Sequence, residues 1–124
     1  MPTVTLDINR LPHRVTTDLV AGDTFAYPVQ LKLNGSAVDL TDCTLALDGI
    51  GPGGAAITGR TITPTDAANG TFEAGLTSEE TAEWENGIAC YQVELTAPVG
   101  HALFAAGIVK TCFEFTIRVT SDLV

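Results

Sequence analysis

Three aspartates lie close together in the segment VDLTDCTLALD, at Asp39, Asp42 and Asp48, and Asp66 with Asn69 forms a second polar group. Loop carboxylates are the ligands that Ca²⁺ prefers, so either group could hold a structural ion. Neither follows the D-x-[DN]-x-[DN]-G spacing of a calcium loop. Aspartate and asparagine also accept hydrogen bonds from backbone N–H groups in turns. The spacing therefore favours turn formation over calcium binding, and we predict no metal site and no cofactor.

Residues that could perform catalysis are few and widely separated. His13 and His101 fall next to proline- and glycine-containing turns, and no G-x-S-x-G, H-E-x-x-H or phosphate-loop motif is present. Cys43, Cys90 and Cys112 include no C-x-x-C pair. Their pattern favours three apolar core residues over one disulfide bond with a leftover thiol. We therefore predict that the protein is not an enzyme.

The charge and length of the chain exclude several classes of partner. The 124 residues are enough for one hydrophobic core, and six basic against fifteen acidic residues give a net charge of −9. Such an acidic surface argues against nucleic acid and against an anionic membrane as partners. The N-terminal MPTVTLDINR has neither the charged nor the apolar region of a signal peptide. The sequence thus predicts a protein made and folded in the cytoplasm.

Alternation of apolar and polar residues, which is typical of strands with one buried face, runs through most of the chain. It predicts strands over residues 3–8, 15–20, 24–33, 43–47, 56–63, 71–76, 88–96, 103–109 and 111–119. Pro28, inside one of these segments, indicates an edge strand or a bulge. Thr77 and Glu80 have the spacing of a capping box and predict one short helix, while Asn34-Gly35 predicts a hairpin turn. We expect an all-β antiparallel sandwich of about seven to nine strands with one short helix.

The N-terminal segment has a strand pattern of its own. Val4, Leu6 and Ile8 alternate with polar residues ahead of the proline at position 12. We expect residues 1–14 to be an N-terminal arm or strand and residues 15–124 to be the sandwich domain. The arm could pair within its own sandwich, or it could add to the sheet of a neighbouring subunit. Val4, Leu6 and Ile8 are therefore candidate partner-binding residues.

Several short motifs occur in a characteristic order. They are Gly22-Asp23-Thr24 opening a strand, Asn34-Gly35, Val38-Asp39-Leu40-Thr41, Thr65-Asp66 through Asn69-Gly70, Leu76-Thr77 with the short helix, and Asn86-Gly87 before the strand from Tyr91 to Leu95. In this order, over about residues 20–120, they resemble the small immunoglobulin-like domain of tailed-phage virion proteins. That domain is best known at the N-terminus of upper baseplate (BppU-type) proteins.

The resemblance implies an immunoglobulin-like (Ig-like) sandwich that is a structural, non-enzymatic part of the virion. Its partners would be other virion proteins and further copies of itself, after synthesis in the host cytoplasm. Baseplate members continue into a fibre or receptor-binding region, whereas this sequence stops at Val124 and carries the N-terminal arm. A capsid decoration protein, a head–tail component and a tail or baseplate component all stay open.

A carbohydrate-binding or adhesive module is the alternative function. Trp84, Tyr91 and a loop aspartate could contact a glycan, because aromatic rings stack on sugars. Trp84 lies beside Glu83 and Glu85 at the end of the predicted helix, where it would cover one end of the core. It is also the fourth candidate partner-binding residue.

Overall fold

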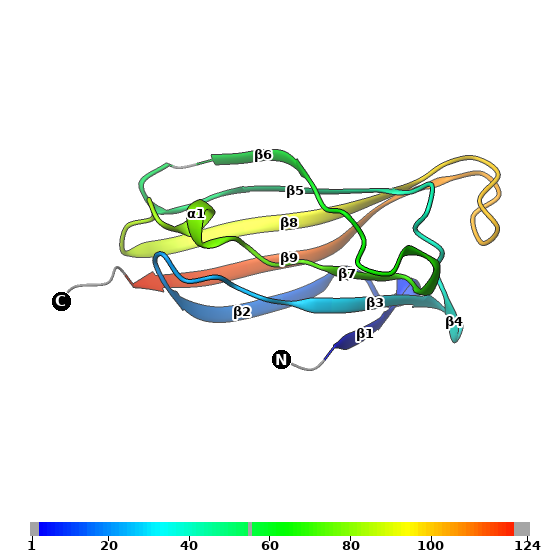
Figure 1. The fold of residues 1–124 in the computed structure, drawn as a ribbon, viewed down its shortest axis with the longest axis horizontal. Coiled ribbons are helices and arrows are strands. Elements are labelled where there is room, and N and C mark those ends of the chain that lie inside the picture. Colours follow the sequence, from blue (N-terminus) through cyan, green and yellow to red (C-terminus); the bar gives the residue numbers. More distant parts are fainter. Residues whose placement is uncertain (1–2, 55, 121–124) are drawn as a thin grey trace.

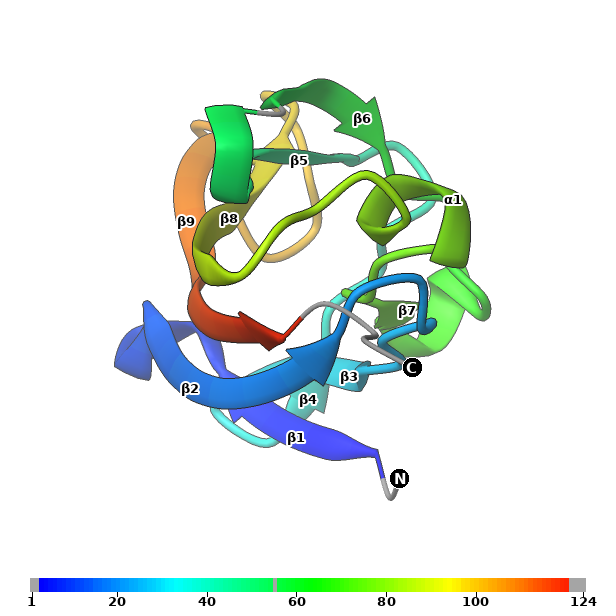
Figure 2. The same cartoon turned by 90° about the vertical axis from the view of Figure 1, so that its left-hand side faces the viewer.

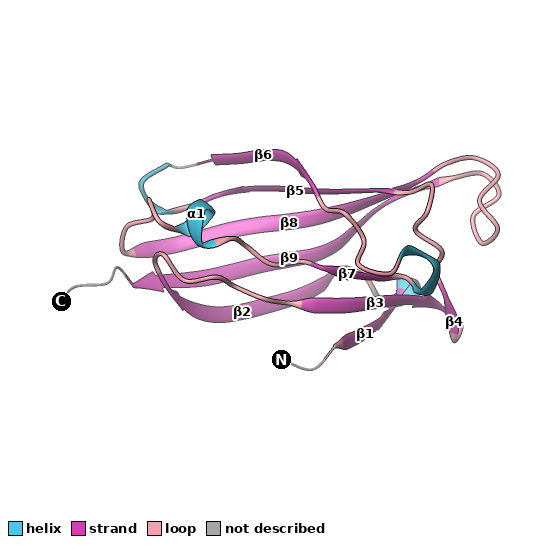
Figure 3. Cartoon of the chain, viewed as in Figure 1, coloured by secondary structure: helices cyan, strands magenta, loops and turns pink. Residues whose placement is uncertain are grey.

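The computed structural model describes residues 3–54 and 56–120, and it consists of two packed β-sheets (Figures 1 and 3). The larger sheet has the strand order β2 (His13–Val20), β9 (Ile108–Thr120), β8 (Gly87–Ala97), β5 (Thr44–Ile50) and β6 (Ala56–Thr61). In the smaller sheet β3 (Pro28–Leu33) pairs with β1 (Val4–Asp7), β4 (Ser36–Ala37) and β7 (Thr71–Glu73). The predicted all-β sandwich is confirmed. The first two residues of the predicted arm and the last four of the predicted domain lie outside the described residues.

The described helices are short and lie in the connections between strands. The α-helix α1 spans Ser78–Thr81, and three 3-10 turns span Ile8–Arg10 (η1), Pro52–Gly54 (η2) and Ala67–Asn69 (η3). Thr77 Oγ1 accepts a hydrogen bond from Glu80 N, and Glu80 Oε1 accepts one from Thr77 N, so the predicted capping box is confirmed. Among the described residues, no helix has the length and hydrophobicity needed to span a membrane.

The sheets are mixed, so the prediction of a purely antiparallel sandwich is wrong in this respect. Strand β1 runs parallel to β3, and β2 runs parallel to β9, while the other pairs are antiparallel. The chain crosses between β1 and β2 from the smaller sheet to the larger one, as Figure 2 shows. Alternation along a strand reports which face is buried and carries no information on the direction of the neighbouring strand.

The core forms between the inward faces of the two sheets. Alternate residues of β8 and β9 point inward and are at most 5% exposed, namely Ala89, Tyr91, Val93, Leu95, Phe113, Phe115, Ile117 and Val119. The ring of Phe115 stacks on Tyr91 at a centroid distance of 4.4 Å and meets Tyr27 edge-on at 5.2 Å. Offset stacking and edge-on contacts are the favoured aromatic arrangements. The predicted buried face of residues 88–96 is thereby confirmed.

Two predicted strand features are wrong. Pro28 is the first residue of β3. This strand pairs with β1 and also with β4 and β7, so it is not an edge strand. Proline is tolerated at the first residue of a strand because its missing N–H need not join the ladder. Residues 103–107 form turns, and β9 begins only at Ile108 and continues to Thr120 as one strand. The hairpin at Asn34-Gly35 is confirmed, with φ of 51° and 87°.

Candidate functional site

The loop aspartates accept hydrogen bonds that shape turns and connections. Asp39 Oδ1 accepts from Thr41 N at 2.9 Å, and Asp48 Oδ1 accepts from Gly59 N at 2.6 Å. The hydrogen bonds from Thr41 lower the pKa of Asp39 below its usual value. The prediction that these aspartates shape turns is confirmed for Asp39, whereas Asp48 lies within β5 and binds the backbone of the neighbouring strand β6. Within residues 3–54 and 56–120, no cluster of three or more His, Cys, Asp or Glu could hold a metal ion.

His101 joins two loops at one end of the sandwich. Its Nδ1 accepts a hydrogen bond from Leu103 N at 3.0 Å, so its Nε2 carries the proton. Nε2 then donates to the carbonyl oxygen of Asp39 at 2.7 Å. Both ring nitrogens are thus engaged with backbone groups, and His101 has a structural position in which neither nitrogen is available as a base.

The cysteines occupy three different environments. Cys112 is buried, and burial raises the pKa of its thiol to about 12, while Cys43 is half-buried. Cys90 is exposed, so the prediction that all three are core residues is wrong for this one. It lies between Ala89 and Tyr91, which point inward, and therefore projects from the opposite face of β8.

The candidate residues of the arm lie against their own sandwich in this structure. Val4 pairs with Val29 and Leu6 with Leu31, and both side chains are half-buried against the core. Ile8 follows in η1 and is 4% exposed.

Asp7 fixes the end of this arm. Its Oδ1 accepts from Asn9 N at 2.9 Å, and its Oδ2 accepts from Asn34 N at 3.0 Å in the β3–β4 turn. The end of β1 is thereby held to a turn that is distant in sequence, and the arm is integrated into the smaller sheet.

Trp84 is enclosed at one end of the core. It is 4% exposed, and a Cβ placed on Gly51 would lie only 2.2 Å from its Nε1, so only glycine fits beside the indole. Tyr91 is 5% exposed, and its hydroxyl donates to the carbonyl oxygen of Ala74 at 3.3 Å. Burial raises the pKa of Tyr91 above its usual value. Neither aromatic ring offers an open face on which a sugar could stack.

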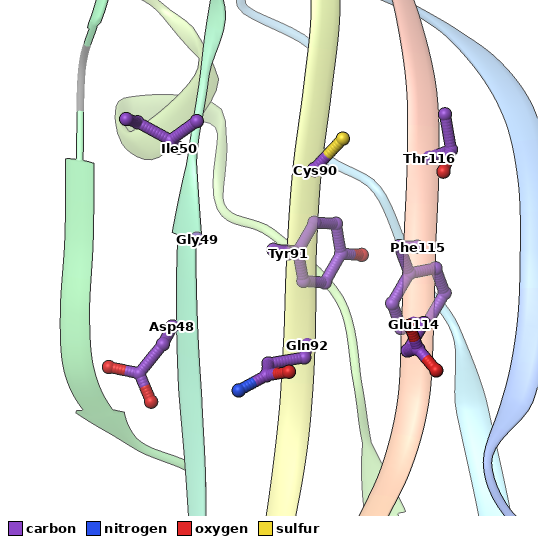
Figure 4. A pocket seen from close by; sticks show the side chains of 9 residues that line it. All are labelled: Asp48, Gly49, Ile50, Cys90, Tyr91, Gln92, Glu114, Phe115 and Thr116. Carbon is purple, nitrogen blue, oxygen red and sulfur yellow. The ribbon is translucent and has the colours of Figure 1, made fainter.

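The outer face of the larger sheet contains a shallow depression of about 440 Å³ over β5, β8 and β9 (Figure 4). Strand register aligns its side chains in two rows, which are Asp48, Gln92 and Glu114, and Ile50, Cys90 and Thr116. Ile50 is 55% exposed, and Ile88, two residues before Cys90 on β8, is 53% exposed. This surface combines two exposed isoleucines, at one end of β5 and β8, with a row of polar and acidic groups, which fits contact with another protein.

Sequence reasoning missed this outer surface. The available signal was that Ile50 and Ile88 occupy the phase of β5 and β8 that is otherwise polar, opposite to their inward residues. A large aliphatic residue on the solvent side of a strand marks an interaction surface only when it forms a patch with other such residues. Which residues become neighbours in a patch depends on the register of the paired strands. Val4 and Leu6, by contrast, lie in β1 of the smaller sheet, and Ile8 follows in η1.

Comparison with known proteins gives a match in structure and none in sequence. Neither a family model nor a curated protein matches the chain. Among solved structures, the N-terminal domain of phage TP901-1 ORF48 matches with a TM-score of 0.55 and 16% sequence identity, covering 95% of this chain and 96% of that one. At this identity the match establishes the fold. The resemblance to a tailed-phage virion immunoglobulin-like domain is confirmed at that level.

Proposed function

We propose that this protein is a non-enzymatic structural component of a phage virion, which acts by docking on other virion proteins. The observation that carries the proposal is the fold match with a phage protein domain over nearly the whole of both chains. The described strands and short helices are the elements from which the proposed docking surfaces are built. The proposal covers a capsid decoration protein, a head–tail component and a tail or baseplate component.

The outer face of the larger sheet supports docking in physical terms. Ile50 and Ile88 are each more than half exposed, and burying such side chains contributes about 25 cal/mol per Å² of apolar surface. Asp48 and Glu114 lie in the row next to Ile50, within a chain whose net charge is −9. The partner surface that fits has apolar groups opposite the isoleucines and basic groups opposite the acidic row.

The arm offers a second mode of docking. If β1 left β3, then Val4, Leu6 and Ile8 would be available to the sheet of a neighbouring subunit, with residues 15–124 as the remaining domain. Such an exchange would break the hydrogen bond from Asn34 N to Asp7 Oδ2 and expose the half-buried Leu6. We therefore rank docking through the outer face above arm exchange. The glycan-binding alternative gains no support, because Trp84 and Tyr91 are buried.

The proposal is tested by looking for the protein in intact particles. Particles of the source phage are purified by density gradient, and the chain is sought by mass spectrometry and then located by cryo-electron microscopy. The proposal predicts a stoichiometric component at symmetry-related positions of the particle. Detection only in the soluble fraction of the lysate would contradict it.

A matched pair of variants then tests the docking surface. Ile50→Asp places a charge on the outer face at the end of β5, while Val99→Asp places one at an 80% exposed turn residue between β8 and β9. We expect Ile50→Asp to be lost from the particle and Val99→Asp to be incorporated normally, both being folded by circular dichroism. Equal incorporation would assign docking to another surface.

A further inference from the structure

The larger sheet has two edges of different character. At one edge, β6 is interrupted by Gly59, with φ of 58°, and its pairing with β5 shifts register between Leu47 and Gly49. At the other edge, β2 is a regular strand of eight residues that contains neither glycine nor proline, and β9 is its one partner among the described strands. Natural edge strands are usually short, bulged or interrupted, because a regular free edge pairs with other chains. Strand β2 lacks these protections.

The orientation of the β2 backbone follows from its hydrogen bonds. Ala21 N, directly after the strand, donates to the carbonyl oxygen of Thr120 on β9 at 2.9 Å. Backbone groups alternate in direction along a strand, so the odd-numbered residues of β2 face β9 and the even-numbered residues face away. Arg14, Thr16 and Asp18 therefore direct their N–H and C=O groups to the free edge. Their side chains are exposed on the outer face of the sheet.

We propose that β2 pairs with β2 of a second copy of this chain, antiparallel, about a two-fold axis at Thr16. In this register Arg14 lies opposite Asp18 of the second copy, Thr16 lies opposite its own equivalent, and Asp18 lies opposite the second Arg14. Each of these pairs joins residues whose backbone groups face the edge, as a hydrogen-bonded antiparallel pair requires. Two sheets of five strands would then become one continuous sheet.

Charge complementarity favours this register and favours a second copy of the chain as the partner. Within one chain, Arg14 Nε lies 3.6 Å from Glu114 Oε1, and Arg118 Nε lies 2.8 Å from Asp18 Oδ1. Across the proposed contact the row on the outer face reads Glu114, Arg14, then Asp18 and Arg118 of the second copy. The charges alternate along the whole row, and two-fold symmetry repeats the row in the opposite direction. Opposite charges on facing residues of paired strands stabilise the pairing, and like charges destabilise it.

Sedimentation equilibrium of the purified chain tests the proposal without any virion partner, so its result is independent of the proposed function. We expect a mass that rises with concentration from 13.0 kDa toward twice that value. Thr16→Pro removes an N–H that faces the edge and leaves the ladder with β9 intact. This variant should stay monomeric at every concentration, with a circular dichroism spectrum like that of the parent.

A charge reversal keeps the test decisive if the proline variant does not fold. Arg14→Asp places a carboxylate opposite Asp18 of the second copy, and two-fold symmetry creates this repulsive pair twice in each dimer. The dissociation constant should rise about tenfold, or about 1.4 kcal/mol. Adding Asp18→Arg to that variant restores opposite charges across the contact and should return the constant to within about threefold of the parent. The substitutions also change contacts with Glu114 and Arg118. These contacts lie within one chain and are the same in monomer and dimer, so they do not alter the dissociation constant.

Arg10→Asp is the matched control, because it makes the same charge change at an exposed residue outside β2. It should leave the dissociation constant unchanged. A parent chain that is monomeric throughout would overturn the proposal. A dimer that is equally stable in Thr16→Pro and Arg14→Asp would also overturn it, since the contact would then lie elsewhere.

Discussion

Strands β1 and β2 are consecutive in the chain, and each pairs in parallel with one neighbouring strand. They differ in whether the rest of the chain covers them. The apolar side chains of β1 lie against the core of their own chain, and Asp7 fixes its end to the β3–β4 turn. Strand β2 also directs Val15 and Leu19 inward, but its other backbone edge is free of strand partners in the described part of the chain. Apolar alternation thus identifies a buried face, while a free backbone edge identifies where another chain can add.

Deletion of residues 1–9 should have the largest effect and separates the two strands. It removes the ladder of β1 on β3 and the buried Ile8, for an expected loss of about 3–5 kcal/mol in the free energy of unfolding. Urea unfolding measures this loss. Self-association through β2 should persist under conditions where the variant is folded. Unchanged stability together with loss of assembly would instead favour the exchanged arm.

Ile8→Ala and Val20→Ala form a matched pair across the same two regions. Ile8 is 4% exposed and Val20 is 41% exposed, at the last position of β2. We expect Ile8→Ala to cost about 2–4 kcal/mol of unfolding free energy, because it leaves a cavity, and Val20→Ala to cost below about 0.5 kcal/mol. Thermal or urea denaturation checks both values. Equal losses would mean that η1 is not packed as described.

Asp7→Ala tests the anchor of β1. The variant leaves Asn9 N and Asn34 N without their carboxylate acceptor, which should cost about 1–2 kcal/mol in unfolding free energy. Asp42→Ala, which makes the same chemical change at an exposed loop residue, should cost less than about 0.5 kcal/mol. A similar loss in both variants would indicate an effect of net charge.

The smallest effect concerns the pH dependence of β2. The hydrogen bond and charge of Arg118 lower the pKa of Asp18, so the folded state binds this proton less readily than the unfolded state. The resulting stabilisation is present above the ordinary pKa of 3.8 and is lost as the pH falls through the lowered folded value. Asp18→Asn should therefore flatten the fall in stability as the pH drops below about 4. A slope identical to that of the parent would show that the pair with Arg118 does not persist in solution.

Much of the sandwich could be predicted because its local signals agree with its tertiary structure. The alternation through residues 88–96 identified the inward face of β8, and the Thr77–Glu80 spacing identified the capped helix. Cys90 shows that residue type alone is not sufficient. Cysteine is usually buried, but Cys90 is exposed because it occupies an outward position in the alternation of β8. Pro28 was compatible with several strand positions, and only the packing of β1 on β3 decided among them.

The surfaces for interaction could not be predicted from the sequence because they depend on long-range pairing. Ile50 and Cys90 are opposite each other only through the register of β5 on β8. The free edge of β2 exists because β9, about a hundred residues later, occupies its other side, as in the pairing of Asp18 with Arg118. No local propensity encodes either relation.

Residue-resolved hydrogen exchange, measured by NMR over a range of protein concentrations, tests the contrast between β1 and β2 most directly. Protection of the Thr16 and Asp18 amides should rise with concentration as the free edge of β2 becomes paired. Protection of the Leu6 amide and the rest of β1 should stay constant. Rapid exchange of the Thr16 and Asp18 amides at every concentration, or concentration-dependent protection confined to β1, would show that β2 is not the pairing edge.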